Sequence, residues 1–424
     1  MSESLPIAKN TRARTPRVSR RVAVAALAAA LVAGAATPAA ATPASTAASG
    51  AVPKAAAGQG RPELQKAIQE WVDSGLAAGM QLRVHDERGE WVGSAGVRKL
   101  GAAAKPPTNG RFWTGSVAKT FTATLVLQLV AKHKIGLDAR VADYLPQYKL
   151  DRRITVRMLL QHTSGLFNYT GEFYDDGTYV PGVPGAGKEW VDNRFKSYRP
   201  EELVRLALSK PAKFEPGTGW SYANTNYVLA ALLIEKVTGH SYAEEMKQRI
   251  LRPLGLSGTE VPGTRTDIVG PHAYGYYRYE DAGQWKVVNV TRQNPSILGA
   301  AGGMISTTED LHTFFSALQG GKLVPAPLLA EMRKPHPKSG GIYGRYGLGT
   351  YVQDTGPDCV GTILNHNGSA PGGYAALMYS TPDGKKTLTA SITTGDAAVD
   401  QAQVFPKALD KLVKQVFCSG KTAG

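Results

Sequence analysis

Thr114-Gly115-Ser116-Val117-Ala118-Lys119 is the stretch that decides the fold, because it opens a long apolar segment with a serine and a lysine three positions apart. The apolar spacing predicts a buried helix over residues 117–133. Residues i and i+3 share one helical face, so the Lys119 amine can reach the Ser116 hydroxyl, and the helix N-terminus stabilises negative charge there. The alternative is a helix cap with a solvated lysine, which conflicts with a helix that is apolar on nearly every face. The stretch therefore predicts a serine nucleophile with an amine as its partner.

A second polar motif, Ser221-Tyr222-Ala223-Asn224-Thr225-Asn226-Tyr227, lies in a predicted turn before a helical stretch over residues 227–238. The phenol of Tyr222 can pass a proton, and the amide of Asn224 can bind a substrate carbonyl. Taken alone, the same residues also fit an N-capping asparagine beside a packed aromatic ring. The motif gains weight from its position in the chain, after the serine and the lysine.

His366-Asn367-Gly368-Ser369 forms a third motif, just before a predicted hairpin of residues 374–380 and 387–393. A polar group followed by a glycine lets a substrate backbone lie along a strand edge. The backbone amides of Ser369 and Ser116 can together form an oxyanion hole. The alternative is a glycine-rich turn with an incidental histidine.

In this order the three motifs resemble those of the serine β-lactamases and low-molecular-weight penicillin-binding proteins, which carry Ser-x-x-Lys, Tyr-x-Asn and a Lys- or His-x-Gly triad. Two further stretches resemble structural segments of the class C branch, namely Leu159-Leu160-Gln161-His162-Thr163-Ser164-Gly165-Leu166 and Gly302-Gly303-Met304-Ile305-Ser306-Thr307. The resemblance runs from about residue 62 to residue 418. It is nearest to the secreted D-alanyl-D-alanine carboxypeptidases of Streptomyces, which share the His-x-Gly triad and a late pair of cysteines.

The resemblance implies an α/β (α+β) fold, in which an antiparallel sheet built from both chain ends is flanked by helices and an all-helical subdomain comes from the middle. It implies that Ser116 forms an acyl-enzyme and that Lys119 and Tyr222 share the proton transfers, with the identity of the base left open. Asn224 is expected to hold the acyl side chain, and His366 to orient a carboxylate or the leaving group. No metal or organic cofactor is expected.

The resemblance specifies the substrate less closely. The related carboxypeptidases hold the substrate's terminal carboxylate with an arginine shortly after Tyr-Gly-Leu-Gly, but here Tyr346-Gly347-Leu348-Gly349 is followed by Thr350-Tyr351-Val352-Gln353. Asn367 and Ser369, on either side of Gly368, stand where threonines are expected, and both side chains can hydrogen-bond a carboxylate.

Three functions stay open at this point. The first is a D-alanyl-D-alanine carboxypeptidase that acts on peptidoglycan stem peptides and is inhibited by β-lactams. The second is an esterase, β-lactamase or D-amino-acid peptidase on the same fold, which the missing arginine favours. The third is a non-catalytic penicillin- or wall-binding protein, and the complete set of Ser116, Lys119 and Tyr222 argues against it.

The N-terminus predicts export. Basic residues precede an apolar run over residues 22–36, and Ala39-Ala40-Ala41 supplies the small residues that a signal peptidase needs. The run is too short for a comfortable membrane span. We therefore expect no stable membrane span and divide the chain into a signal peptide (1–41), an Ala/Thr/Pro linker (42–60) and a catalytic domain (61–420). The sequence leaves the Sec and twin-arginine routes open.

The composition is that of an ordinary globular protein, with 424 residues, 42% hydrophobic and 20% charged. Its formal charge of +15 falls to about +10 without the signal peptide. Such a charge suits a polyanionic cell wall, or simply keeps the protein soluble. The sequence contains no basic run with interleaved aromatic residues, which is the pattern that would indicate nucleic-acid binding. We expect a secreted protein, free or associated with the wall, that acts on a peptidoglycan peptide or a small acyl substrate.

Cys359 and Cys418 are the only cysteines, and in an exported chain such a pair predicts a disulfide rather than a metal site. The bridge is expected to hold the C-terminal helix to a distant strand and to contribute about 4 kcal/mol in the chain-entropy model. His162 is predicted to be structural. Three other histidines are predicted to lie at the surface or at helix ends, without the spacing of zinc ligands; they are His85, His133 and His240.

Periodicity predicts secondary structure near both chain ends and a middle that consists mainly of helix and irregular loop over residues 140–290. The predicted elements are a helix from Pro62 to Gly75, a hairpin of residues 81–84 and 91–97, a helix over 201–209 and an apolar helical face over 409–417.

Overall fold

The structure is a computed structural model that describes residues 60–357, 359–394 and 401–418. The predicted signal peptide, and the predicted linker apart from Gly60, lie outside the described residues. Within the described ranges, no helix has both the length and the apolar character needed to cross a membrane.

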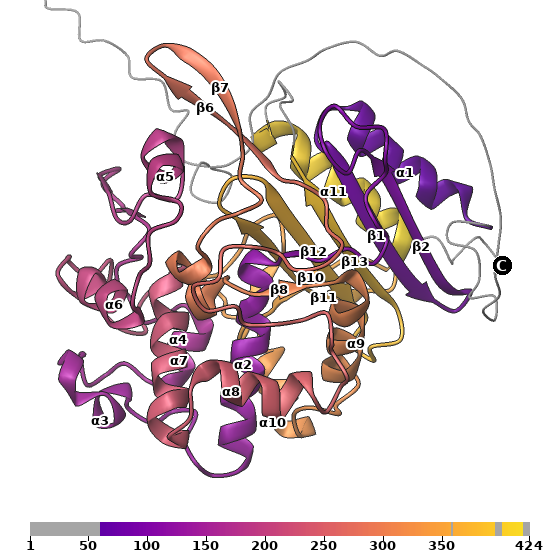
Figure 1. Cartoon of the computed structure of the whole chain (residues 1–424). Coiled ribbons are helices and arrows are strands. Elements are labelled where there is room, and N and C mark those ends of the chain that lie inside the picture. Colours follow the sequence, from indigo (N-terminus) through magenta and orange to yellow (C-terminus); the bar gives the residue numbers. More distant parts are fainter. Residues whose placement is uncertain (1–59, 358, 395–400, 419–424) are drawn as a thin grey trace, which may run out of the picture.

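A seven-stranded antiparallel sheet forms the centre of the molecule, in the order β2-β1-β13-β12-β11-β10-β9 (Figure 1). Its first two strands come from the N-terminal part of the chain and the other five from the C-terminal part. The strands are β1 (Gly79–Asp86), β2 (Gly89–Gly96), β9 (Arg345–Tyr346), β10 (Tyr351–Asp354), β11 (Thr362–Ala370), β12 (Tyr374–Ser380) and β13 (Thr387–Thr393). Both predicted hairpins, β1–β2 and β12–β13, are confirmed.

One face of the sheet is covered by the helices from the two ends of the chain, α1 (Pro62–Asp73) and α11 (Gln401–Phe417). Their apolar stripes pack with one side of the strands into a separate core that includes Trp71, Leu82 and Leu412. The predicted disulfide between Cys359 and Cys418 is present, with the two Cα atoms 4.1 Å apart. It ties the end of α11 to the segment that leads into β11.

The other face carries α9 and the helical middle of the chain. At the centre of this region, α2 (Ala118–Ala131) is buried on nearly all sides, because its residues are apolar or small all round the helix. The remaining helices are α3 (Val141–Tyr144), α4 (Val156–Gln161), α5 (Gly187–Asn193), α6 (Pro200–Leu208), α7 (Asn224–Thr238), α8 (Tyr242–Met246), α9 (Thr308–Gln319) and α10 (Ala326–Met332).

The structure also contains short strands that the sequence did not predict. The longest pair is the hairpin β6 (Tyr276–Asp281) and β7 (Gln284–Asn289), which projects from the body of the molecule (Figure 1). Its two turn residues, Ala282 and Gly283, both have positive φ, at 51° and 77°, as a tight hairpin turn requires. The smaller pairs are β3 (Phe112–Trp113) with β8 (Ile305–Ser306), and β4 (Glu172–Phe173) with β5 (Tyr179–Val180).

Candidate active site

Ser116 lies in a single 3-10 turn, η1 (Gly115–Val117), that leads directly into α2. The predicted buried helix is present, but the serine precedes its first α-helical turn. Gly115 has φ of +53°, and a Cβ atom there would lie 2.5 Å from the backbone of Ser369. A Cβ on Gly368 would in turn lie 2.0 Å from the carbonyl oxygen of Thr114. The backbones of the serine turn and of β11 are therefore in direct contact, and only glycine allows this approach.

Lys119 is fully buried and makes three polar contacts. Its Nζ lies 3.0 Å from Ser116 Oγ, 2.8 Å from Asn224 Oδ1 and 2.7 Å from the carbonyl oxygen of Ala301. Burial lowers the pKa of Lys119 well below its ordinary value. Among the ion pairs of the described residues, none involves Lys119. Burial without a carboxylate partner therefore favours the neutral form of the amine.

Lys119 has one more polar contact than a neutral amine has N–H groups. An uncharged amine has two N–H groups and one lone pair, and both Asn224 Oδ1 and the Ala301 carbonyl can only accept. The third contact is with Ser116 Oγ, 3.0 Å from Nζ: an ammonium donates to this oxygen, whereas the lone pair of a neutral amine accepts the hydroxyl hydrogen. The arrangement can therefore take the proton of the serine.

Tyr222 also forms a hydrogen bond with Ser116. Its ring centroid lies 4.7 Å from Lys119 Nζ. Burial raises the pKa of Tyr222 well above its ordinary value, so the residue stays a phenol rather than a phenolate. Ser116, Lys119 and Tyr222, which the sequence predicted as a set, are thus brought together with one group able to accept a proton and one able to donate it.

Asn224 is the first residue of α7 and is held at three points. Its Oδ1 accepts from Lys119, its Nδ2 donates to Thr170 Oγ1 at 3.3 Å, and its backbone N–H donates to Asn168 Oδ1 at 3.0 Å. The sequence did not predict the contacts of Asn168, Thr170 and the Ala301 carbonyl. The two side chains come from a loop without periodicity, and the carbonyl is a backbone group that no side-chain pattern can signal.

His366 lies within β11, whereas the sequence placed its motif ahead of the last strands. Its Nδ1 donates to the carbonyl of Asn367 at 2.8 Å, so Nε2 is the acceptor for the Tyr346 hydroxyl at 3.1 Å. Burial lowers the pKa of His366 to about 3. The ring is therefore neutral and both nitrogens are occupied, so in this structure it does not offer the expected contact to a carboxylate or leaving group.

Asn367 is not part of the site that the structure assembles. Its Nδ2 donates to the Tyr379 hydroxyl at 2.6 Å, and Tyr379 belongs to the core beneath α1 and α11. Successive side chains of a strand point to opposite faces, so Asn367 faces away from Ser116, contrary to the expectation of a carboxylate contact. The Ser369 side chain is exposed. The Ser369 backbone lies against Gly115, the position at which the predicted oxyanion hole requires its amide.

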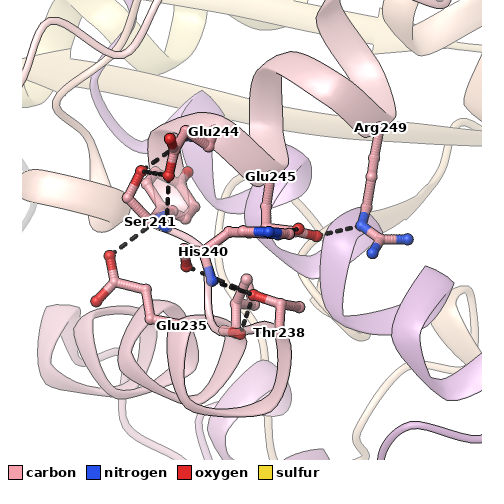
Figure 2. Close-up of polar contacts among 9 residues, drawn as sticks. Glu235, Thr238, His240, Ser241, Glu244, Glu245 and Arg249 are labelled. Atoms are coloured by element: carbon pink, nitrogen blue, oxygen red, sulfur yellow. Dashed lines mark hydrogen bonds and ion pairs between the residues drawn. The ribbon is translucent and has the colours of Figure 1, made fainter.

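The other histidines were predicted to be structural or peripheral. His162 ends α4 and its Nδ1 accepts from the backbone N–H of Ala223 at 3.2 Å, which confirms a scaffolding contact next to Tyr222. His133 is exposed just beyond α2. His240 follows the end of α7, and its Nδ1 donates to Glu245 Oε1 at 2.9 Å (Figure 2). His85 is half-buried, its ring 5.0 Å from that of His312.

Comparison with known proteins decides the family. The family model described as Beta-lactamase matches residues 64–411, most of the described chain. The chain belongs to the beta-lactamase family. This confirms the resemblance drawn from the three motifs, and the expected mixed fold with an antiparallel sheet flanked by helices is confirmed as well.

Individual members of the beta-lactamase family show how the similarity is distributed. A D-stereospecific amidohydrolase from Streptomyces sp. is 34% identical, and its structure aligns over 86% of this chain and 99% of that chain with a TM-score of 0.72. Penicillin-binding protein 4* of Bacillus subtilis (strain 168) is 31% identical over 291 residues, 66% of this chain and 60% of that protein. The chain thus spans less than two thirds of that relative's length. A teichoic acid D-alanine hydrolase of Staphylococcus aureus is 26% identical over 306 residues, 68% of this chain and 66% of that protein.

Proposed function

We propose that this chain is a serine hydrolase that cleaves amides or esters at the carbonyl of a D-amino-acid residue, through an acyl-enzyme on Ser116. The observation that carries the proposal is the hydrogen-bonded set of Ser116, the buried Lys119 with its lowered pKa, and Tyr222 with its raised pKa. An intact set of this kind argues for catalysis rather than for a non-catalytic binding protein.

In the proposed reaction, Lys119 Nζ takes the Ser116 hydroxyl proton while Oγ attacks the substrate carbonyl. The backbone amides of Ser116 and Ser369 stabilise the oxyanion. The phenol of Tyr222 gives its proton to the leaving nitrogen or oxygen, the bond to the acyl carbon breaks, and Tyr222 regains a proton from Lys119. Water then attacks the acyl carbon, and the residues that accepted and donated protons in the first half exchange these roles. This step releases a carboxylic acid and restores the serine.

The electrostatics of the site support a substrate without a free carboxylate next to the scissile bond. The chain has no arginine in the stretch after Gly349, where the related carboxypeptidases carry one. His366 itself is neutral and fully hydrogen-bonded. An amide or ester leaving group needs no such cation, and the similarity to a D-stereospecific amidohydrolase supports the same substrate class.

A D-alanyl-D-alanine carboxypeptidase is the second candidate. It is favoured by the similarity to penicillin-binding protein 4* and by the exposed Ser369 side chain on β11, which is a possible hydrogen-bond donor to a carboxylate. In either case we propose that the protein is exported, that it acts on a peptidoglycan peptide or a small acyl substrate outside the cell, and that β-lactams acylate Ser116.

The test compares the exported form of the chain with its Ser116→Ala variant. Intact-mass analysis with a labelled penicillin is expected to show one adduct that the variant lacks. Turnover is then measured on D-alanine amide, on its L enantiomer and on an acyl-D-Ala-D-Ala peptide. We expect the D-amide to exceed the peptide by about tenfold or more in kcat/KM, because a charge-assisted contact to the carboxylate is missing.

A faster peptide would replace the amidohydrolase by the carboxypeptidase. Equal rates on D- and L-alanine amide would reject the proposed stereospecificity. The absence of both an adduct and turnover on every substrate would reject the enzyme altogether and leave a binding protein.

A further inference from the structure

A cavity of about 410 Å³ lies outside the catalytic residues, between the end of α5, the segment over residues 267–274 and the end of β7. Cavities that bind small ligands commonly have this size. In Figure 1, α5 and the β6–β7 hairpin lie beside each other, and residue contacts join α5 to β6. The side chains that matter to its chemistry are Arg194, Arg292, Tyr274 and Asp267.

The walls of the cavity are tied together by hydrogen bonds between distant segments. The backbone N–H of Asn294 donates to the carbonyl of Arg194 at 2.7 Å, and its side chain donates to the Phe195 carbonyl at 3.3 Å. The backbone N–H of Gln293 donates to the Thr266 carbonyl at 3.1 Å. These bonds hold the cavity open in one shape, so a ligand needs little reorganisation to enter.

The charge that lines the cavity is positive. Arg194 and Arg292 are opposed by one carboxylate, Asp267, which lies 3.7 Å from the Arg292 guanidinium. Lys99 adds a further cation, with its Nζ 5.6 Å from the centroid of the Tyr274 ring. An anion in the cavity therefore meets a surplus of cationic groups.

One donor in this lining lacks a partner. Nε of Arg194 is buried and forms no hydrogen bond with any of the described residues, although another nitrogen of the same guanidinium donates to the Val191 carbonyl at 2.5 Å. Nε is shielded from the cavity as well as from solvent, but Arg194 forms no ion pair with any of the described residues, so the charge of its guanidinium is available to an anion in the cavity. A guanidinium fork matches phosphate oxygens in particular.

We infer that this cavity is a binding site for a phosphate group, held by Arg194 and Arg292 and separate from the Ser116 site. Two guanidinium groups from different segments can contact a tetrahedral oxyanion from two directions. A planar carboxylate, in contrast, is bound by the paired N–H groups of a single guanidinium. The phosphate belongs either to a phosphodiester polymer or to a free phosphate ion, and both present the same oxygens. The inference does not rest on the proposed hydrolase activity.

The experiment is calorimetric titration of the exported chain at constant ionic strength with inorganic phosphate, with a short glycerol phosphodiester oligomer and with acetate. We expect at least one of the two phosphate probes to bind about tenfold more tightly than acetate. Binding of the oligomer alone identifies the polymer as the source, and binding of inorganic phosphate alone identifies the free ion. Binding of neither probe, or acetate binding as tightly as phosphate, would overturn the inference.

Two variants and one matched control locate the site. Arg292→Gln is expected to weaken phosphate binding about tenfold, and Asp267→Asn to tighten it, since the opposing carboxylate is lost. Arg152→Gln is the control, because Arg152 is 68% exposed and paired with Asp143, much as Arg292 is 69% exposed and paired with Asp267. If Arg292→Gln and Arg152→Gln have the same effect, the cavity is not the binding site.

Discussion

Lys119 and Glu245 are both fully buried ionisable side chains, and the protein deals with them in opposite ways. Lys119 contacts a hydroxyl and two carbonyl oxygens but no carboxylate, and burial lowers its pKa, which favours the neutral amine. Glu245 lies between His240 and Arg249 (Figure 2). Burial alone would raise the pKa of Glu245, but the hydrogen bonds from Arg249 and His240 outweigh it and keep the pKa below its ordinary value.

The difference separates a reactive group from a structural one. A neutral amine can accept a proton, and it exists because its surroundings withhold a counter-ion. A paired carboxylate keeps its charge and joins the α7–α8 connection to the turn that follows α8, and both of its oxygens are held by these structural contacts. In this protein, a buried ionisable side chain therefore indicates a catalytic role only where it lacks an oppositely charged partner.

The largest expected effect comes from removing the unpaired group. Lys119→Met keeps the length of the side chain but removes the base, so kcat/KM should fall by about 10³-fold. The melting temperature should not fall, since a desolvated amine is replaced by an apolar group. Steady-state kinetics and thermal unfolding measure the two effects. Lys132→Met, an exposed lysine just beyond the same helix, is the control and should change neither.

Removing the paired group should do the reverse. Glu245→Gln leaves Arg249 without its anion, and we expect the free energy of unfolding to fall by about 2 kcal/mol, less than for a fully enclosed pair because Arg249 is partly exposed. Urea denaturation measures the change, and kcat should stay within a factor of about two. Glu280→Gln, at an exposed position of β6, is the control. A loss of activity in Glu245→Gln without a loss of stability would contradict the division of roles.

The sequence predicted one side of this comparison and not the other. The Ser-x-x-Lys spacing, together with an apolar helix, was enough to predict a buried lysine beside a serine, and both features are present. Glu244 and Glu245 are adjacent and chemically identical, yet the first caps α8 from the surface while the second is buried. Which of the two turns inward depends on how α8 packs, and no local pattern records that.

The misses at the active site have a related cause. The third motif was found, but the side-chain directions within it depend on the strand register. That register places Asn367 on the far face of the sheet. It also places both ring nitrogens of His366 in hydrogen bonds. The β6–β7 hairpin escaped prediction because its turn is Ala282-Gly283 rather than a typical Asn-Gly and its strands mix charged with aromatic residues. The regular hairpins at the chain ends alternate more plainly and were predicted with nearly correct bounds.

The pH dependence of stability should separate the two groups at opposite ends of the scale. Lys119 binds a proton in the unfolded chain but not in the folded one, so its cost to stability shrinks as the pH rises towards 10.5. Glu245 contributes fully above pH 4.5, and its contribution is lost as the pH falls through the lowered folded pKa. The stability differences of Lys119→Met and Glu245→Gln from the wild type should therefore vanish at high and at low pH, respectively. Chemical denaturation across the pH range measures both, and differences that do not depend on pH would refute these assignments.

The smallest expected effect tests which of its two partners matters more to Glu245. His240 is 55% exposed and Arg249 only 25%, so solvent screens the histidine contact more strongly. His240→Gln should lower the free energy of unfolding by about 0.5 kcal/mol, and Arg249→Gln by more, because it also removes the hydrogen bond that lowers the pKa of Glu245 most. The same urea titrations measure both, with the exposed His133→Gln as the control. If His240→Gln proved the more damaging change, Glu245 would be held mainly by the loop after α7.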